Sequence, residues 1–164
     1  MKKLFLVAVI TVAGFISADA QEFQFGAGPT IGLPIGDASD ISSFAVGAEI
    51  QGEYKFSDMV SGVGNFGYTH FLGKDLGGFK FNFGAIPILV GARVYPSEQF
   101  FIGGQIGYGI FTGDADGGGF AYRPHIGYNA GSFQLSLNYN GISDDGANIS
   151  WLGLTGIFKF GGGK

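Results

Sequence analysis

The sequence predicts an all-β fold, an eight-stranded antiparallel up-and-down transmembrane β-barrel preceded by a cleaved signal peptide. Three observations support this prediction: an export signal at the start, strands with one apolar and one polar face along most of the remainder, and connections that alternate in length. Successive side chains of a strand point to opposite faces, so a barrel built from these strands has one apolar wall and one polar wall.

Residues 1–20 have the features of a signal peptide. Lys2 and Lys3 form a basic start, residues 4–16 are uncharged and apolar, and Ala18 and Ala20 frame a small-x-small cleavage site. The apolar stretch is shorter than the roughly 20 residues of a membrane-spanning helix, which makes a retained anchor the weaker alternative. We therefore expect export and cleavage after Ala20, leaving one barrel domain over residues 21–164.

The composition favours a membrane protein that crosses with strands. Charged residues make up 13% of the chain, against about 25% in a typical soluble domain. The 32 glycines could indicate disorder, but 18 phenylalanines argue for a chain that buries surface. Cysteine is absent, which excludes disulfides, thiolate metal sites and a lipid-modified N-terminal cysteine. No apolar run after the signal is long enough for a spanning helix.

The clearest strands form a hairpin at about residues 120–140, with an apolar parity that includes Phe120 and Tyr128 and a polar parity that includes Arg123 and His125. The same alternation marks the other strands. The expected strands cover about residues 22–32, 44–56, 60–71, 79–95, 99–111, 120–129, 133–140 and 149–160.

The fourth strand has the least regular pattern. Phe79, Phe81 and Phe83 alternate with polar residues and predict an apolar face, but the alternation blurs near Pro87. A proline inside a strand is typical of a bulge, which would shift the parity. The direction of Arg93 therefore stays open at this stage.

The connections indicate which kind of barrel this is. Long loops are expected at residues 33–43, 72–78, 112–119 and 141–148, and short turns near residues 57–58, 96–98 and 131–132. In an up-and-down meander alternate connections share an end, so the long loops lie together opposite the short turns and the termini. This layout is typical of bacterial outer-membrane barrels. The alternative, a soluble lipocalin-type barrel, would be apolar inside and charged outside.

Aromatic residues near the strand ends, such as Phe44, Tyr54, Phe133 and Tyr139, predict girdles at the two membrane interfaces.

In length, strand number and loop order, the sequence resembles the small outer-membrane barrels of the OmpX and OmpA-barrel type, and the outer-membrane β-barrel domain family of Bacteroidetes. Phe158 and Phe160 are similar to the aromatic pair of the C-terminal signal read by the barrel-assembly machinery, although residue 155 is Thr where that signal usually has glycine.

This resemblance implies an integral protein of the Gram-negative outer membrane, with extracellular loops and periplasmic termini. It also implies contact with outer-membrane lipid and lipopolysaccharide, assembly by the barrel-assembly machinery, and a monomer. It implies little about function, because such barrels serve many roles.

Polar side chains of inward parity are expected to fill the lumen, since eight strands leave room for little more than side chains. Strands two and six face each other across an eight-stranded meander, so Arg123 is expected to pair with Glu49 or Glu53. The predicted lumen network comprises Glu49, Gln51, Glu53, Lys55, Asn65, Lys80, Gln105, Arg123, His125, Asn129 and Lys159. We therefore expect a closed barrel with a structural or surface-interaction role. Inward glycines, which remove volume, favour the alternative of a narrow, porin-like channel for small solutes.

The predicted loops are acidic, with Lys74 as their one base. We interpret them as a hydrophilic rim, with divalent-ion bridging to lipopolysaccharide as the alternative. The predicted loop acids are Asp37, Asp40, Asp75, Asp114, Asp116, Asp144 and Asp145.

Candidates for chemistry are few. His70 and His125 are the only histidines and belong to no ligand-spaced cluster, so no metal or cofactor is expected. Some eight-stranded barrels are lipid-modifying enzymes with a histidine and a serine two residues apart. Here the corresponding residues are Gly127 and Leu72, so an enzyme is not expected. Since the sequence contains no basic patch or aromatic platform, nucleic acid is not an expected partner.

Overall fold

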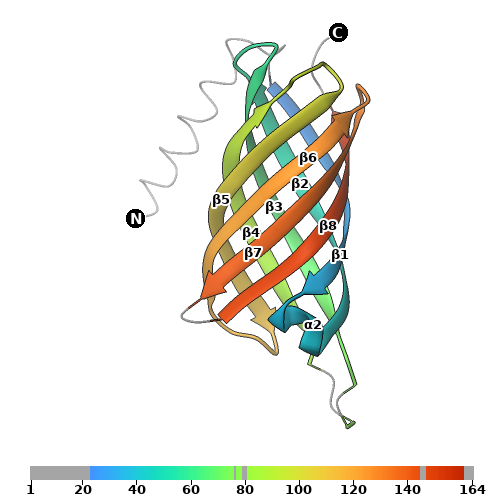
Figure 1. The fold of residues 1–164 in the computed structure, drawn as a ribbon, viewed down its shortest axis with the longest axis vertical. Helices are drawn as coiled ribbons and strands as arrows, with labels where there is room; N and C mark the ends of the chain where they lie inside the picture. The colour runs from blue at the N-terminus through green and yellow to red at the C-terminus, as the bar shows by residue number, and fades with distance from the viewer. Residues whose placement is uncertain (1–22, 76, 79–80, 145–146, 161–164) are drawn as a thin grey trace.

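The structure, a computed structural model, describes residues 23–75, 77–78, 81–144 and 147–160 and forms a closed barrel of eight antiparallel strands (Figure 1). Each strand pairs with its neighbours in sequence, and β1 also pairs with β8. The predicted up-and-down topology is therefore confirmed, and the sheet has no free edge. The strands are β1 (Phe23–Ile35), β2 (Ser42–Lys55), β3 (Val60–Gly73), β4 (Phe83–Val94), β5 (Phe100–Gly113), β6 (Gly118–Asn129), β7 (Phe133–Asp144) and β8 (Ala147–Phe160).

The two ends of the barrel carry different connections between strands (Figure 1). We call the end with the β2–β3, β4–β5 and β6–β7 connections the turn end, and the opposite end the loop end. The short helix α2 (Asp37–Ile41) lies at the loop end. Among the described residues, no helix is long and apolar enough to cross a membrane.

All strands except β4 extend further at the loop end than predicted. The prediction of a long loop at residues 141–148 is wrong, because Ser143 of β7 pairs with Asn148 of β8 and only two residues separate Asp144 from Ala147. The irregular connection between β1 and β2 is also shorter than the loop predicted at residues 33–43, because β1 continues to Ile35 and α2 occupies most of the residues between the two strands. Apolar alternation marks only the part of a strand with an apolar face, whereas backbone pairing continues through polar residues.

The prediction for β4 is wrong in three respects. The strand begins at Phe83 instead of residue 79, and the Phe83 side chain is buried inside the barrel instead of facing outward. No bulge occurs at Pro87, since the β4–β5 register runs unshifted through the Pro87–Gly109 pair. The proline instead removes ladder pairs on the β3 side, where the pairing resumes in the same register. The parity therefore continues, and Arg93 points inward.

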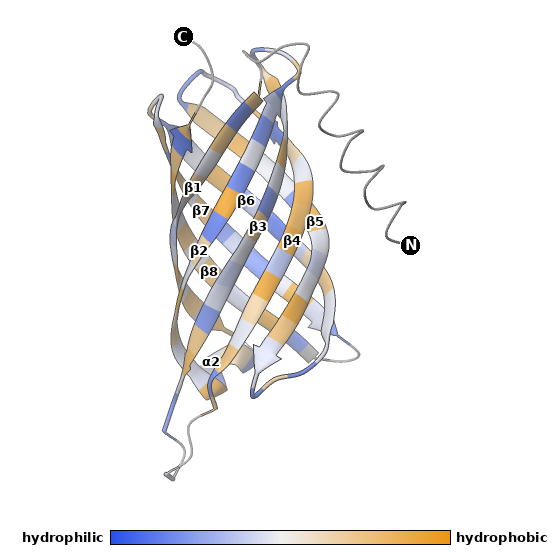
Figure 2. Cartoon of the chain, turned by 180° about the vertical axis from the view of Figure 1, so that it is seen from behind, coloured by the Kyte–Doolittle hydropathy of each residue, from blue (hydrophilic) through white to orange (hydrophobic). Residues whose placement is uncertain are grey.

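The outer wall of the barrel is apolar. Large hydrophobic residues are 38% to 66% exposed, and most of them come from the outward parity of the strands. In the described strands, Asp, Glu, Lys and Arg occur only at inward parity. Figure 2 shows hydrophobic and hydrophilic residues alternating along the strands.

Aromatic residues of the outer wall gather towards both ends. At the turn end the rings of Phe100 and Tyr128 lie 5.2 Å apart. At the loop end Tyr122 stacks on Tyr139 at 6.0 Å and on Phe120 at 6.3 Å. This distribution matches the two interfacial belts of membrane barrels.

Glycine allows neighbouring strands to approach closely at particular points. A Cβ atom on Gly107 of β5 would lie 1.9 Å from the carbonyl oxygen of Ile88 on β4. Gly104 of the same strand, by contrast, has open space around its Cβ position. Only some of the glycines are therefore required by packing.

Candidate functional site: the lumen

Two layers fill the lumen of the barrel. A polar network extends from the turn end to mid-barrel, and an apolar cluster fills the loop end. The network contains both ion pairs found among the described residues, Arg93–Glu53 and Arg123–Glu49.

Arg93 is the centre of the first half of the network. Its Nη1 donates to Glu53 Oε2 at 3.0 Å and to Gln134 Oε1 at 3.1 Å, and its Nη2 donates to Gln51 Oε1 at 2.8 Å. Its Nε donates to His125 Nε2 at 3.0 Å. One guanidinium thus joins β4 to β2, β6 and β7, and it uses the planar fork of donors that lysine lacks.

Glu53 is the most heavily bonded acceptor. In addition to Arg93, its carboxylate accepts hydrogen bonds from Ser61 Oγ at 2.6 Å, from Gln134 Nε2 at 3.1 Å and from the Tyr95 hydroxyl. The side chain is 1% exposed. A buried carboxylate is tolerated only when it is paired and hydrogen-bonded, and both of its oxygens are satisfied here.

Arg123 and Glu49 form the second half of the network. Arg123 Nη1 lies 2.8 Å from Glu49 Oε2, and its Nε donates to Asn140 Oδ1 at 2.6 Å. Glu49 Oε1 accepts from Asn65 Nδ2 at 2.9 Å, and Asn65 Oδ1 accepts in turn from Gln105 Nε2 at 2.7 Å. This chain of bonds crosses the lumen from β6 to β2, which is the pairing expected from the topology.

His125 is held between the two arginines. Because Arg93 Nε donates to Nε2, the hydrogen of the neutral ring lies on Nδ1, 3.2 Å from the Arg123 carbonyl oxygen. Both ring nitrogens are therefore occupied within the network, and neither is free to act as a base or a metal ligand. His70 lies on the outer wall, with Nδ1 3.3 Å from the Tyr68 hydroxyl.

Three more of the predicted lumen residues, Lys55, Asn129 and Lys159, lie at the turn end. Lys159 Nζ donates to Asn129 Oδ1 at 2.7 Å, and Lys55 Nζ lies 6.0 Å from the centre of the Tyr95 ring. Lys80 lies outside the described residues. The central role of Arg93 was not predicted, although unbroken parity from Leu89 would have placed its side chain inward.

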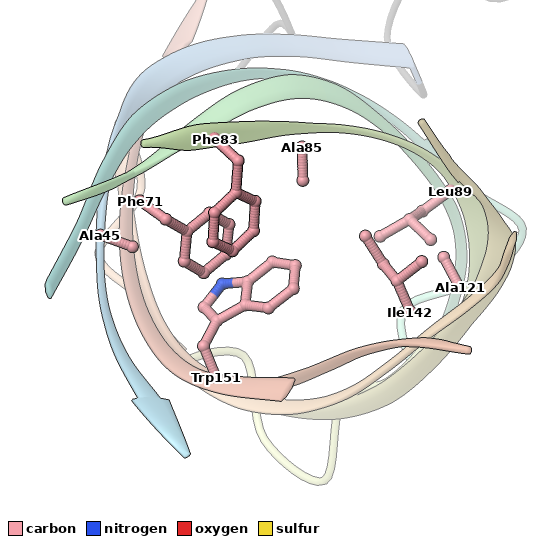
Figure 3. Packing of buried hydrophobic residues seen from close by; sticks show 8 residues of the cluster. All are labelled: Ala45, Phe71, Phe83, Ala85, Leu89, Ala121, Ile142 and Trp151. Atoms are coloured by element: carbon pink, nitrogen blue, oxygen red, sulfur yellow. The ribbon is translucent and has the colours of Figure 1, made fainter. Parts of the chain in front are cut away.

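The apolar cluster at the loop end was not predicted. Phe71 stacks on Phe83 at 4.5 Å and meets Trp151 edge-on at 5.1 Å (Figure 3). Ile142 and Leu89 lie on the other side of the lumen, and Ile41 of α2 packs against the cluster. The full cluster, which we call the plug, is Ala45, Phe71, Phe83, Ala85, Leu89, Ala121, Ile142 and Trp151. The tryptophan at inward parity in β8 was its clearest sequence signal.

Several of the predicted loop acids organise the loop end. Asp114 Oδ2 accepts from the backbone N–H of Asn82 at 2.9 Å, and Asp75 Oδ1 accepts from that of Gly78 at 2.8 Å. Asp144 belongs to β7 instead of a loop, and its Oδ2 accepts from the N–H of Gly118 at 3.3 Å.

Of the other predicted loop acids, Asp37 and Asp40 lie on α2, Asp116 is exposed, and Asp145 lies outside the described residues. In the described part of the chain, no group of three or more His, Asp or Glu residues could hold a metal ion.

The fold is that of small eight-stranded outer-membrane β-barrels. Ail of Yersinia pestis, crystallised with the heparin analogue sucrose octasulfate, is 16% identical with a TM-score of 0.62 over 85% of this chain and 98% of Ail. OprG from Pseudomonas aeruginosa is 15% identical with a TM-score of 0.53, over 86% of this chain and 96% of OprG. Neisserial surface protein A is 15% identical with a TM-score of 0.51, over 84% of this chain and 97% of its own. No known protein family and no curated protein matches the sequence.

Proposed function

We propose that this protein is an integral outer-membrane β-barrel whose lumen is closed by its own side chains, and that it has a structural or surface-interaction role. The observation that carries the proposal is the way side chains fill the lumen along the barrel axis. The ion-paired network lies between the turn end and mid-barrel, and the plug lies at the loop end. A solute crossing the barrel would have to displace both.

The composition of the outer wall itself supports membrane insertion. Soluble monomers rarely expose apolar patches larger than a few hundred Å². Here the outward parity of all eight strands is free of Asp, Glu, Lys and Arg among the described residues. Lipid is the solvent that such a surface requires.

The inward glycines, which favour a channel because they remove volume, do not leave an open path through the lumen. A Cβ on Gly127 would lie 2.2 Å from Phe101 Cζ, and one on Gly109 would lie 2.4 Å from Ile142 Cδ1. Neighbouring side chains therefore fill the volume that these glycines free. An ion would lose its hydration shell on entering the plug, which is costly in an apolar environment.

We further propose that the loop end is extracellular and the turn end periplasmic. The layout of short periplasmic turns and longer outer loops in bacterial barrels supports this orientation. Contact with outer-membrane lipid and lipopolysaccharide, assembly by the barrel-assembly machinery and a monomeric state belong to the same proposal.

The charge of the loop end bears on the kind of surface partner. Its described acids, Asp37, Asp40, Asp75, Asp114, Asp116 and Asp144, outnumber its one described base, Lys74. Like charges repel, so these loops disfavour a polyanion of the kind bound in the Ail crystal. We expect a neutral or cationic partner instead.

Single-channel recording tests the closed lumen. Purified full-length protein, refolded and inserted into planar bilayers, is expected to leave the membrane non-conducting. Steady conductance of the wild-type protein would overturn the closed barrel and favour the channel.

A further inference from the structure

A polar cavity of 390 Å³ opens at the turn end of the lumen. It is lined by inward residues at the strand ends and by residues of all three turns. Its lining is Lys55, Asp58, Tyr95, Glu98, Gln99, Asn129 and Gly131. Its volume lies in the range of small-molecule sites.

One lysine, Lys55, lines the wall of the cavity, and a second, Lys159, lies behind Asn129. Lys55 and Lys159 belong to inward parity at the ends of β2 and β8, and Lys159 is linked to the cavity through Asn129 at 2.7 Å. Neither lysine forms an ion pair with a carboxylate of the described residues. The carboxylate below them, Glu53, is already bonded to Arg93, Ser61 and Gln134.

The rim of the cavity is negative. Asp58 lies in the β2–β3 turn and Glu98 in the β4–β5 turn, so both acids lie beyond the strand ends that carry the lysines. Within the described residues neither acid is ion-paired. The cavity therefore presents Lys55 on its wall, Lys159 behind Asn129, and Asp58 and Glu98 at its entrance, and none of these four residues is ion-paired within the described part of the chain.

Hydrogen bonds hold the rim in place before any ligand arrives. Ser57 Oγ accepts from the backbone N–H groups of Met59 and Val60 at 3.3 Å and 3.1 Å. The Tyr95 N–H donates to the Met59 carbonyl at 2.9 Å and connects the β2–β3 turn to the end of β4. Asn129 Nδ2 donates to the Glu98 carbonyl at 3.3 Å, which connects β6 to the β4–β5 turn. A preorganised site loses less entropy on binding.

We propose that this cavity binds a small zwitterion of dipeptide size, with its carboxylate towards Lys55 and Lys159 and its ammonium group towards Asp58 and Glu98. A simple anion would meet the acids of the rim, and a simple cation would meet the two lysines. A ligand with both charges satisfies both sets, and charge-assisted hydrogen bonds are the stronger kind. The cavity is separate from the plug, so binding of the zwitterion in the cavity does not depend on whether the barrel conducts ions.

Calorimetric titration of the refolded full-length protein in detergent micelles tests this site. The probe is L-alanyl-L-alanine, compared with its N-acetylated form, which lacks the ammonium group, and its C-terminal amide, which lacks the carboxylate. We expect the free dipeptide to bind about tenfold or more tightly than either blocked form, since each blocked form loses charge-assisted hydrogen bonds. Equal binding of the acetylated form would overturn the proposal in favour of a plain anion site, and absence of dipeptide binding would overturn it entirely.

Paired substitutions assign the two halves of the site. Lys55→Met with Lys159→Met should abolish the preference for the free carboxylate, and Asp58→Asn with Glu98→Gln should abolish the preference for the free ammonium. Lys74→Met, at the loop end, should leave dipeptide affinity unchanged. Unchanged preferences in both double variants would contradict the assignment. The blocked peptides test the wild-type protein, so the test stands even if a variant fails to fold.

Discussion

Arg123 Nη1 lies 2.8 Å from Glu49 Oε2, and this ion pair joins β6 and β2 across the lumen. Both residues are almost completely buried, at 5% and 6% exposure. Removing one partner would leave the other charge uncompensated inside the barrel, which costs more than the pair itself contributes.

Arg123→Ala should therefore lower the free energy of unfolding by about 3 kcal/mol. Arg123→Ala combined with Glu49→Ala should recover part of that loss, because no unpaired charge remains. Arg123→Ala combined with Glu53→Ala is the matched control and should recover nothing, since Glu53 pairs with Arg93. Urea unfolding of the refolded protein in detergent measures all three, and an Arg123→Ala variant as stable as wild type would contradict the pairing.

Arg93→Lys should be destabilising although it keeps the charge. Lysine cannot reproduce bonds to Glu53, Gln134, Gln51 and His125 from one planar group. Loss of charge-assisted hydrogen bonds predicts a decrease of about 2 kcal/mol in the free energy of unfolding. Lys55→Met, which removes a nearby charge outside this cluster, should cost less than about 0.5 kcal/mol in the same assay. Similar effects of both changes would argue against a central role for Arg93.

Trp151 is the only tryptophan of the chain and lies inside the plug at 2% exposure. Its fluorescence should therefore resist quenching by brominated lipids. A Trp151→Phe, Leu152→Trp variant moves the indole by one residue to the outer wall, where Leu152 is 42% exposed, and should be strongly quenched. Strong quenching of the wild-type protein would place Trp151 in contact with lipid and refute the plug.

Two glycines of β5 should respond differently to the same substitution. Gly107→Ala forces a Cβ against the Ile88 carbonyl and should destabilise the barrel by about 1–3 kcal/mol. Gly104→Ala meets no atom within 4 Å and should change stability little. Heat-dependent mobility in detergent gels compares the stability of the two variants. Equal losses of stability would show that β4 and β5 do not approach closely at Gly107.

The proposed orientation can be tested by labelling, because the chain contains no cysteine of its own. Single cysteines at Asp40 and Asp116 should react with an impermeant maleimide in intact cells. A single cysteine at Ser97, in the β4–β5 turn, should react only after the outer membrane is permeabilised. Reaction at Ser97 alone would invert the orientation.

Period-two alternation predicted the strands and the outer wall because lipid favours apolar residues at outward positions. This rule gives the wrong direction for the side chains of Phe83 and Trp151 and no direction for that of Arg93. The rule assumes that an apolar residue faces out, yet Phe83 and Trp151 pack against Phe71 inside the lumen. The sequence alone does not decide which way the Arg93 side chain points, because Pro87 is typical of a bulge, whereas in the structure the strand pairs on either side of the proline keep the same register. Which acid Arg123 contacts depends on the stagger of the strands, which alternation does not encode.

The plug divides the barrel electrically as well as sterically. Its apolar layer, lined by Phe71, Phe83 and Trp151, contains few dipoles that can reorient, so its dielectric response is weaker than that of the hydrogen-bonded section on the turn side. A voltage across the bilayer would therefore fall mainly over the plug, and the charges around Arg93 would remain close to the potential of the turn-side compartment. A voltage-sensitive probe in the lumen would accordingly respond to membrane potential near Trp151 and hardly at all near Tyr95.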